Sequence, residues 1–461
     1  MSTTGTQGPV EIDMGRVEDI IRREEQALRD KQPRSLAYQR EASRRLPGGV
    51  SSSWQTAPPH PIYVSHGKGS KVWDIDGNAF VDYHNGYGVM VVGHAHPKVV
   101  EAVKRRIELG SHFAQPTEDA LVVADNLAER TGLPYWRFGN SGTEATLDAC
   151  RLMRAATGRD LLIKCEGIYH GHHDALMVSV YPSPEVWGPH ERPNPVAQTP
   201  GLPKSYVELT RVVPFNDAEA VKRVFEEFPG QIAGMILEPC MTNLGVTLPE
   251  PGYLQAIKEI CHANGAYLAF DEVKTGATVA WGGATQAFGV TPDLACFAKA
   301  IGGGLPCGAI GGVEEIMELV VRGKVEQVGT FNGNPLTLAA SRAALTEVLT
   351  KDAYAHFDRL HDIIRAGVQA AIDRYRLPAR ITTLGAKGGV NWKAEPVREF
   401  RDALDIDERL SYAAWLWQLN RGVFKSPWAK WESWTISVAH TEEDARLYVE
   451  NFEGFAEAIT A

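Results

Sequence analysis

One lysine of this chain stands in surroundings that favour chemistry. Lys299 lies in the stretch Cys296–Pro306, where apolar residues flank it and three glycines follow. A lysine in apolar surroundings loses hydration, which disfavours its ammonium form and leaves an amine that can attack a carbonyl. The glycines permit a sharp turn and a close approach of a ligand. The pattern therefore predicts a Schiff-base lysine, and the alternative is a lysine that reaches solvent before a flexible loop.

A second stretch, Phe138–Glu144, predicts an anion site. A short strand stops, Ser141, Gly142 and Thr143 form a turn, and a helix begins. The backbone N–H groups and the dipole at such a helix start attract anions, and the hydroxyls add donors. An ordinary helix cap by Ser141 or Thr143 is the alternative interpretation.

Asp271 ends the apolar run Leu268–Phe270, and its carboxylate could hold a cationic ring nitrogen. A turn or cap residue at a strand end is the alternative.

Gly329–Pro335 is a turn-rich loop in which Thr330 offers another hydroxyl, although turn chemistry alone also explains that loop.

The segment Glu166–Asp174 holds three histidines and two acids. Its H-x-H-H-D spacing matches no common zinc pattern, so no metal is expected. Tyr169 is better explained as an aromatic platform for a flat ligand.

Together these residues offer an amine nucleophile, an acid for a cationic ring, an anion cradle and an aromatic face. We expect each of them just after a strand. Pyridoxal phosphate is the cofactor that requires all four.

Composition sets the broader limits. The chain has 461 residues, 44% of them apolar, and a formal net charge of −10. This length predicts one large domain with a smaller one, and the acidic balance argues against a nucleic-acid surface. Six scattered cysteines without a C-x-x-C pair fit buried, reduced thiols. With no signal peptide and no long apolar run, we expect a cytoplasmic protein without membrane association.

Short apolar strands alternate with helices from Pro97 onward, which predicts parallel βαβ units and an α/β fold. In such sheets ligands bind at the carboxyl ends of the strands. Lys71–Ile75 and Ala79–Tyr83 predict a hairpin around an Asp-Gly-Asn turn. The expected strands are 135–138, 160–165, 232–237, 266–270 and 294–298, and the expected helices are 99–109, 117–129, 144–156, 218–228, 253–264, 335–348, 353–375 and 441–459.

The ordered motifs of the chain resemble those of fold-type I, class III aminotransferases, and most closely those of the glutamate-1-semialdehyde aminomutases. The resemblance runs from about Pro47 to Gly454. It rests on P-G-G-V (47–50), W-D-I-D-G-N (73–78), G-H-A-H-P (93–97), N-S-G-T-E-A (140–145), Y-H-G-H (169–172), D-E-V-K-T-G (271–276), A-K-A-I-G-G-G-L-P (298–306), G-T-F-N-G-N-P (329–335) and S-V-A-H-T-E-E-D (437–444).

The resemblance implies a large domain with a mostly parallel sheet flanked by helices and a smaller α+β domain. We place an N-terminal arm with part of the small domain at 1–75, the large cofactor-binding domain at 76–340 and the C-terminal small domain at 341–461. It further implies a homodimer with a shared active site, because Thr330 is expected to reach the phosphate of the neighbouring subunit.

The resemblance also assigns roles to single residues. Lys299 binds the cofactor covalently and moves a proton, and Asp271 keeps the pyridine nitrogen protonated. Lys274 is the rival lysine, at a position where the family usually has an apolar residue. The remaining expected cofactor contacts are Ser141, Gly142 and Thr143 at the phosphate, Tyr169 and Val273 on the ring faces, and Glu238 and Asn243 near the ring hydroxyl.

The chain departs from the aminomutase pattern at expected substrate positions. Gln55 stands where these enzymes carry an arginine for the substrate carboxylate, and glutamine cannot form the charged, bidentate clamp. Glu326 replaces a tyrosine, and Tyr87 replaces a tryptophan. Glu432 matches an acidic position of the aminomutases. The expected substrate-contacting residues are Ser52, Gln55, Tyr87, Glu326 and Glu432.

These departures favour a transaminase that moves an amino group from a small amine donor to a carbonyl acceptor by a ping-pong mechanism. A glutamate-1-semialdehyde aminomutase remains an alternative and would need another cation, such as Lys425 or Lys430. A racemase or epimerase on the same scaffold is the third possibility. A regulator that binds the cofactor without catalysis is disfavoured, because Lys299 and Asp271 are both present.

Overall fold

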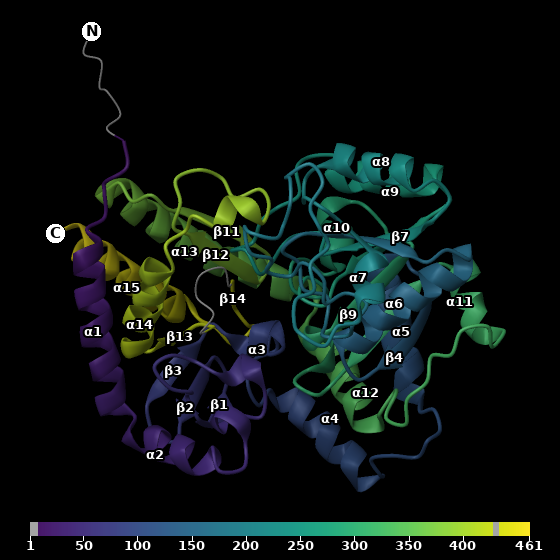
Figure 1. Cartoon of the computed structure of the whole chain (residues 1–461). Coiled ribbons are helices and arrows are strands. Elements are labelled where there is room, and N and C mark those ends of the chain that lie inside the picture. The colour runs from purple at the N-terminus through teal and green to yellow at the C-terminus, as the bar shows by residue number, and fades with distance from the viewer. Residues whose placement is uncertain (1–7, 427–432) are drawn as a thin grey trace.

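The computed structural model describes residues 8–426 and 433–461 and divides into a large and a small part (Figure 1). A seven-stranded sheet with the order β4-β10-β9-β8-β7-β5-β6 forms the centre of the large part. Only β10 runs antiparallel to its neighbours, so the expected mostly parallel sheet is confirmed. Its strands are β4 (Tyr135–Gly139), β5 (Leu161–Cys165), β6 (Thr210–Val213), β7 (Ile232–Leu237), β8 (Tyr267–Asp271), β9 (Leu294–Ala298) and β10 (Gly308–Gly312).

Helices cover both faces of this sheet, because its central strands are apolar throughout rather than alternating. On β8, Ala269 packs into a cluster with α6 and α11, whereas its neighbours Leu268 and Phe270 pack into the larger core on the opposite face. The helices of the large part are α4 (Pro97–Glu108), α5 (Glu118–Thr131), α6 (Gly142–Thr157), α7 (Lys204–Glu208), α8 (Ala218–Glu227), α9 (Tyr253–Ala263), α10 (Gly283–Phe288), α11 (Glu314–Val321) and α12 (Pro335–Ala343).

The small part joins the two ends of the chain. One sheet, β1-β2-β3-β13, pairs β3 with β13 from the C-terminal region, and a second has the order β11-β12-β14. Its strands are β1 (Val64–Lys68), β2 (Lys71–Asp74), β3 (Ala79–Asp82), β11 (Arg380–Leu384), β12 (Lys387–Asn391), β13 (Val423–Phe424) and β14 (Trp434–Thr435). Its helices are α1 (Met14–Lys31), α2 (Pro33–Ala42), α13 (Lys351–Tyr375), α14 (Glu408–Asn420) and α15 (Glu442–Thr460), with the short α3 (Asn85–Gly88) between the two parts.

The expected strands and helices are present, with ends shifted by a few residues. The sequence did not reveal β10, whose Gly-Ala-Ile-Gly-Gly composition has low strand propensity and which forms because two strands flank it. The proposed division at residue 75 falls in the turn between β2 and β3, so the N-terminal sheet continues beyond it. None of the described helices combines enough length and apolar character to cross a bilayer.

Arg130 ties together the helical layer beside the sheet. It is 5% exposed, and its guanidinium donates to the carbonyls of Trp281, Leu345 and Leu349 at 2.7 to 2.8 Å. Its Nε also donates to Asn126 within α5. One buried side chain therefore satisfies three carbonyls from two distant segments.

We expect Arg130→Met to lower the free energy of unfolding by about 3 kcal/mol or more, because each buried carbonyl left without a donor costs about 1 kcal/mol or more. Urea unfolding followed by circular dichroism measures the change. Arg446→Met is the control, since Arg446 forms an exposed ion pair with Glu442 that contributes less than about 1 kcal/mol. Equal unfolding midpoints for the two variants would contradict this role.

Candidate active site

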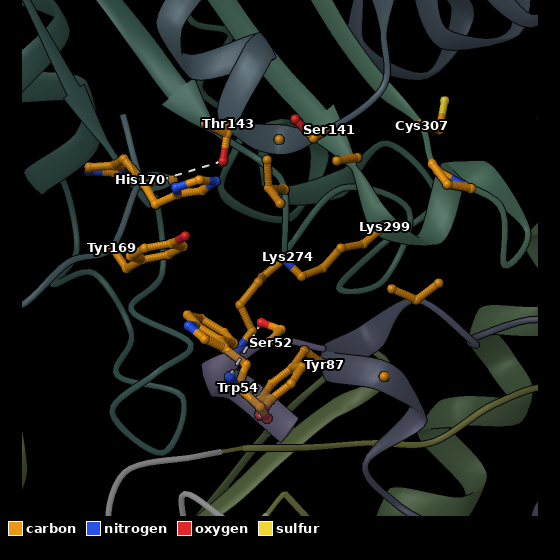
Figure 2. Close-up of a pocket in the computed structure, with 18 of the residues that line it drawn as sticks. Ser52, Trp54, Tyr87, Ser141, Thr143, Tyr169, His170, Lys274, Lys299 and Cys307 are labelled. Carbon is orange, nitrogen blue, oxygen red and sulfur yellow. Dashed lines mark hydrogen bonds between the residues drawn. The ribbon is translucent and has the colours of Figure 1, made fainter. Parts of the chain in front are cut away.

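A cavity of about 740 Å³ lies where the strand ends of the large sheet meet residues of the N-terminal part (Figure 2). The ends of β8 and β9 and the start of α6 form one side. Segment 52–55 and α3 form the other. The structure therefore brings together residues that are up to 255 positions apart, from Ser52 to Cys307.

Lys299 follows β9 directly and lines this cavity. Its φ of +50° lies in the left-handed region, which is unusual for a residue with a side chain and is typical of functional turns. Gly303 and Gly304, with φ of +58° and +105°, form a turn in the backbone after Lys299. The predicted glycine turn after Lys299 is present, and Lys299 is half-buried in the cavity wall.

Asp271 ends β8 and is 3% exposed. One carboxylate oxygen accepts the N–H of Val273 at 3.0 Å, and the other lies 2.7 Å from Nδ1 of His170. Burial lowers the pKa of His170, although its hydrogen bond to Asp271 opposes that shift. A neutral imidazole that donates from Nδ1 stabilises the ionised carboxylate.

His170 is a site residue that sequence reasoning did not single out. It lies 101 positions before Asp271, so no local spacing connects the two, and only the neighbouring ends of the parallel strands place them together. In the same segment, His173 lies 3.2 Å from the hydroxyl of Thr146, and burial lowers its pKa to about 4. Within the described residues, no cluster of His, Cys, Asp and Glu is placed to hold a metal ion.

The start of α6 forms the predicted anion cradle. Ser141 caps the helix by accepting the N–H of Glu144 at 3.2 Å, so the cap interpretation of Ser141 is correct. The N–H groups of Gly142 and Thr143 occupy the first helical positions, where no intrahelical acceptor exists. A Cβ at Gly142 would lie 2.8 Å from Val273, which explains the glycine. Ser141, Gly142, Thr143 and Val273 all line the cavity.

Three aromatic side chains, contributed by both parts of the molecule, form one wall of the cavity. The ring centroid of Tyr169 lies 5.1 Å from that of Trp54, which lies 4.9 Å from that of Tyr87. The Tyr87 hydroxyl donates to the carbonyl of Trp54 at 2.8 Å. Burial and the nearby Asp271 raise the pKa of Tyr169, so its phenol stays protonated at neutral pH. Trp54 was not among the predicted site residues.

Glu238, Asn243 and Lys274 line a further part of the cavity. Nζ of Lys274 donates to Oδ1 of Asn243 at 2.6 Å. Burial, and to a smaller extent Asp271, raise the pKa of Glu238 to about 7, although Lys274 and Lys299 act to lower it. Both lysines therefore act electrostatically on the same buried acid, and Lys274 belongs to the site.

Other predicted residues are placed differently. Ser52 and Gln55 line the cavity, but the amide oxygen of Gln55 accepts the N–H of Ser51 at 3.0 Å. Glu326 and Thr330 are exposed and lie outside this cavity. Glu432 falls outside the described residues.

Thr330 lines a second hollow, of about 620 Å³, with His112 and Phe113. Its loop connects α11 to α12, so the expectation that this motif follows a strand is wrong. Turn-forming residues are equally suited to a connection between helices, which is why the pattern was misleading.

Comparisons with known proteins agree with this geometry. The aminotransferase class-III family matches residues 52–417. The chain belongs to this family. It is 39% identical over 416 residues to glutamate-1-semialdehyde 2,1-aminomutase 2 of Bacillus thuringiensis (strain Al Hakam), covering 89% of this chain and 95% of the relative.

Two solved structures are similar over almost the whole chain. The crystal structure of an omega-transaminase from Sphaerobacter thermophilus has a TM-score of 0.87 at 31% identity, and covers 93% of this chain and 98% of its own. The crystal structure of a glutamate-1-semialdehyde-aminomutase from Pseudomonas aeruginosa PAO1 in complex with PMP has a TM-score of 0.89 at 31% identity. The match covers 98% of this chain and 100% of the aminomutase chain.

Membership of the class III family confirms the predicted enzyme class and pyridoxal phosphate as the cofactor. The residues present fit that group. The start of α6 is suited to bind its phosphate, and Asp271 is suited to pair with its ring nitrogen. Lys299 is suited to react with its aldehyde. Tyr169 and Val273 are suited to pack on the two faces of its ring.

We expect borohydride treatment of the purified yellow holoenzyme to attach the cofactor permanently to Lys299, which peptide mapping will locate. Lys299→Ala should still bind the cofactor but lose at least about a thousandfold in turnover, because it removes both nucleophile and proton carrier. A label on Lys274 would refute the assignment of Lys299.

We expect Asp271→Asn to retain the cofactor, measured by absorbance, but to lose about a hundredfold or more in turnover, as for other positioned electrostatic groups. An amide cannot stabilise a cationic ring nitrogen. Asp174→Asn is the control, because Asp174 is exposed on the loop after His170. Turnover of Asp271→Asn close to that of the parent would contradict the role.

Proposed function

We propose that this enzyme is a transaminase that moves an amino group between a primary amine or amino compound and a keto acid, aldehyde or ketone. The donor leaves as a carbonyl compound before the acceptor enters, so the reaction is ping-pong. Bound pyridoxal phosphate supplies an aldehyde that takes up the amino group and a cationic ring that withdraws electrons from the reacting carbon.

The side chains of the cavity divide the work of this reaction. Lys299 would hold the cofactor through its amine, and that amine would move a proton at the reacting carbon of the donor. Asp271, oriented by His170 and by the N–H of Val273, maintains the positive ring nitrogen. The wall of Trp54, Tyr87 and Tyr169 encloses the substrate side.

The observation that favours transamination over isomerisation is the charge of the cavity lining. No arginine is among the described residues that line it. Gln55 stands where the resemblance predicts the arginine that binds the carboxylate of glutamate semialdehyde. A glutamine hydrogen bond contributes about 1 kcal/mol, less than a charged one. The distal carboxylate of that substrate therefore has no guanidinium clamp among the described lining residues.

The second candidate, a glutamate-1-semialdehyde aminomutase, is supported by the names of relatives that are 39% identical. It requires a cation to replace the arginine. Lys425 lies outside the cavity lining, and Lys430 falls outside the described residues. Net amino transfer to an added keto acid separates a transaminase from this isomerase and from a racemase.

We also propose that the enzyme is a homodimer with a shared active site. Val328 and Phe331, beside Thr330, are 78% and 58% exposed, and Phe113 across the same hollow is 46% exposed. Exposed apolar side chains gathered in this way are typical of a surface that contacts another protein chain. A cytoplasmic location is proposed as well, because all six cysteines are buried and unpaired.

We expect primary amines to be better substrates than glutamate-1-semialdehyde, measured as kcat/KM over a panel of monoamines, diamines and amino sugars with pyruvate or 2-oxoglutarate. Gln55→Arg should improve kcat/KM for carboxylate-bearing donors about fivefold, because a charged hydrogen bond adds about 1 kcal/mol over a neutral one. Gln55→Met is the neutral control. Isomerisation of the semialdehyde by the parent without a keto acid would establish the aminomutase function instead.

A further inference from the structure

Lys274 is the feature of this cavity that the proposed reaction has not used. It lies three residues after Asp271, is 5% exposed and lines the cavity together with Lys299 (Figure 2). Burial of a cation is costly unless other groups compensate for the lost hydration. The resemblance places an apolar side chain at this position in other members of the family. A lysine here therefore departs from the pattern that the resemblance implies.

The backbone around Lys274 fixes where its side chain begins. The Lys274 carbonyl accepts the hydroxyl of Thr278 at 2.7 Å. Nearby, buried Glu272 accepts the hydroxyl of Thr275 at 2.7 Å and the N–H of Ala284 at 2.8 Å. The turn after β8 is therefore held from several sides, and Lys274 starts from a rigid support, as residues that bind a ligand require.

The contacts described for the Lys274 side chain are polar. Asn243 accepts its hydrogen bond at 2.6 Å and carries no charge. Glu238 is the acid on which Lys274 acts, and burial raises the pKa of Glu238 to about 7 even though Lys274 and Lys299 both lower it. Lys274 therefore lies close to a buried acid and is held by a neutral amide.

The other lysine of the cavity lining already has a task in the proposed reaction. Lys299 is bound to the cofactor in the proposed resting enzyme and acts as an amine afterwards. Among the described residues of the lining, Lys274 is then the remaining lysine or arginine. We propose that Lys274 is a specificity-determining residue that binds an anionic oxygen of the bound reactants. That oxygen belongs either to the ring hydroxyl of the cofactor or to the carboxylate of the keto acid acceptor.

The two sources predict different measurements on the holoenzyme of Lys274→Met, which removes the charge and keeps an unbranched side chain only one atom shorter. If Lys274 binds the ring oxygen, the pH midpoint of the absorbance of the bound cofactor should rise by about one unit, a tenfold change in the equilibrium. If it binds the acceptor, kcat/KM for pyruvate should fall about tenfold or more relative to an aldehyde acceptor without a carboxylate.

Three further variants make the test decisive. Lys274→Arg should restore much of either effect, because it restores the charge. Lys274→Gln, neutral but able to hydrogen-bond, should behave like Lys274→Met, and it replaces that variant if the latter does not fold. Lys222→Met on exposed α8 is the control that leaves both readouts unchanged. A folded, cofactor-loaded Lys274 variant with parental values in both measurements would overturn the proposal.

This inference rests on the proposed function in one experiment only, the comparison of kcat/KM between the two acceptors. The absorbance titration requires the cofactor alone, so it tests Lys274 even if the parent transfers no amino group. A parent without amino transfer would refute the transaminase, whereas unchanged titrations together with unchanged acceptor preference would refute the role of Lys274. The two failures are therefore distinguishable.

Discussion

The hydrogen bond between His170 and Asp271 is the interaction on which the site depends. Both residues are almost fully buried, and 2.7 Å separates Nδ1 from the carboxylate. An unpaired carboxylate at that depth would be protonated or would destabilise the fold. Paired with an imidazole and with a backbone N–H, it remains an acceptor that can hold a cationic ring. The parallel order of β5, β7 and β8 is what brings the two residues to one edge of the sheet.

The second constraint is that neither part of the molecule contains the cavity alone. The strand ends of the large part provide Lys299, Asp271 and the start of α6, whereas Trp54 and Tyr87 come from segments beside the N-terminal sheet (Figure 1). Enclosure between the parts lowers the effective dielectric constant, which strengthens each electrostatic interaction inside. The same enclosure raises the pKa of Glu238 and of Tyr169.

Charge distinguishes this site from what the resemblance implies. The chain has a glutamine in place of an arginine near the mouth of the cavity and a lysine in place of an apolar residue deep inside it. A guanidinium at the mouth would attract a distal carboxylate, whereas an ammonium beside Asn243 acts close to the reacting groups. The positive charge is therefore deeper in this cavity than the pattern of the aminomutases predicts, and the range of substrates should change accordingly.

Much of the site could be predicted from sequence because its parts are local. A lysine before three glycines, an acid at the end of an apolar strand and a Ser-Gly-Thr turn before a helix each need only a few neighbouring residues to be recognised. Alternating strands and helices determined the α/β fold, since parallel strands place their carboxyl ends at one edge. Tertiary structure decided the rest. It paired His170 with Asp271 across 101 positions, formed β10 from glycines between two strands, and placed Lys274 beside Glu238 and Asn243. Such contacts depend on how distant segments pack, and no spacing along the chain encodes them.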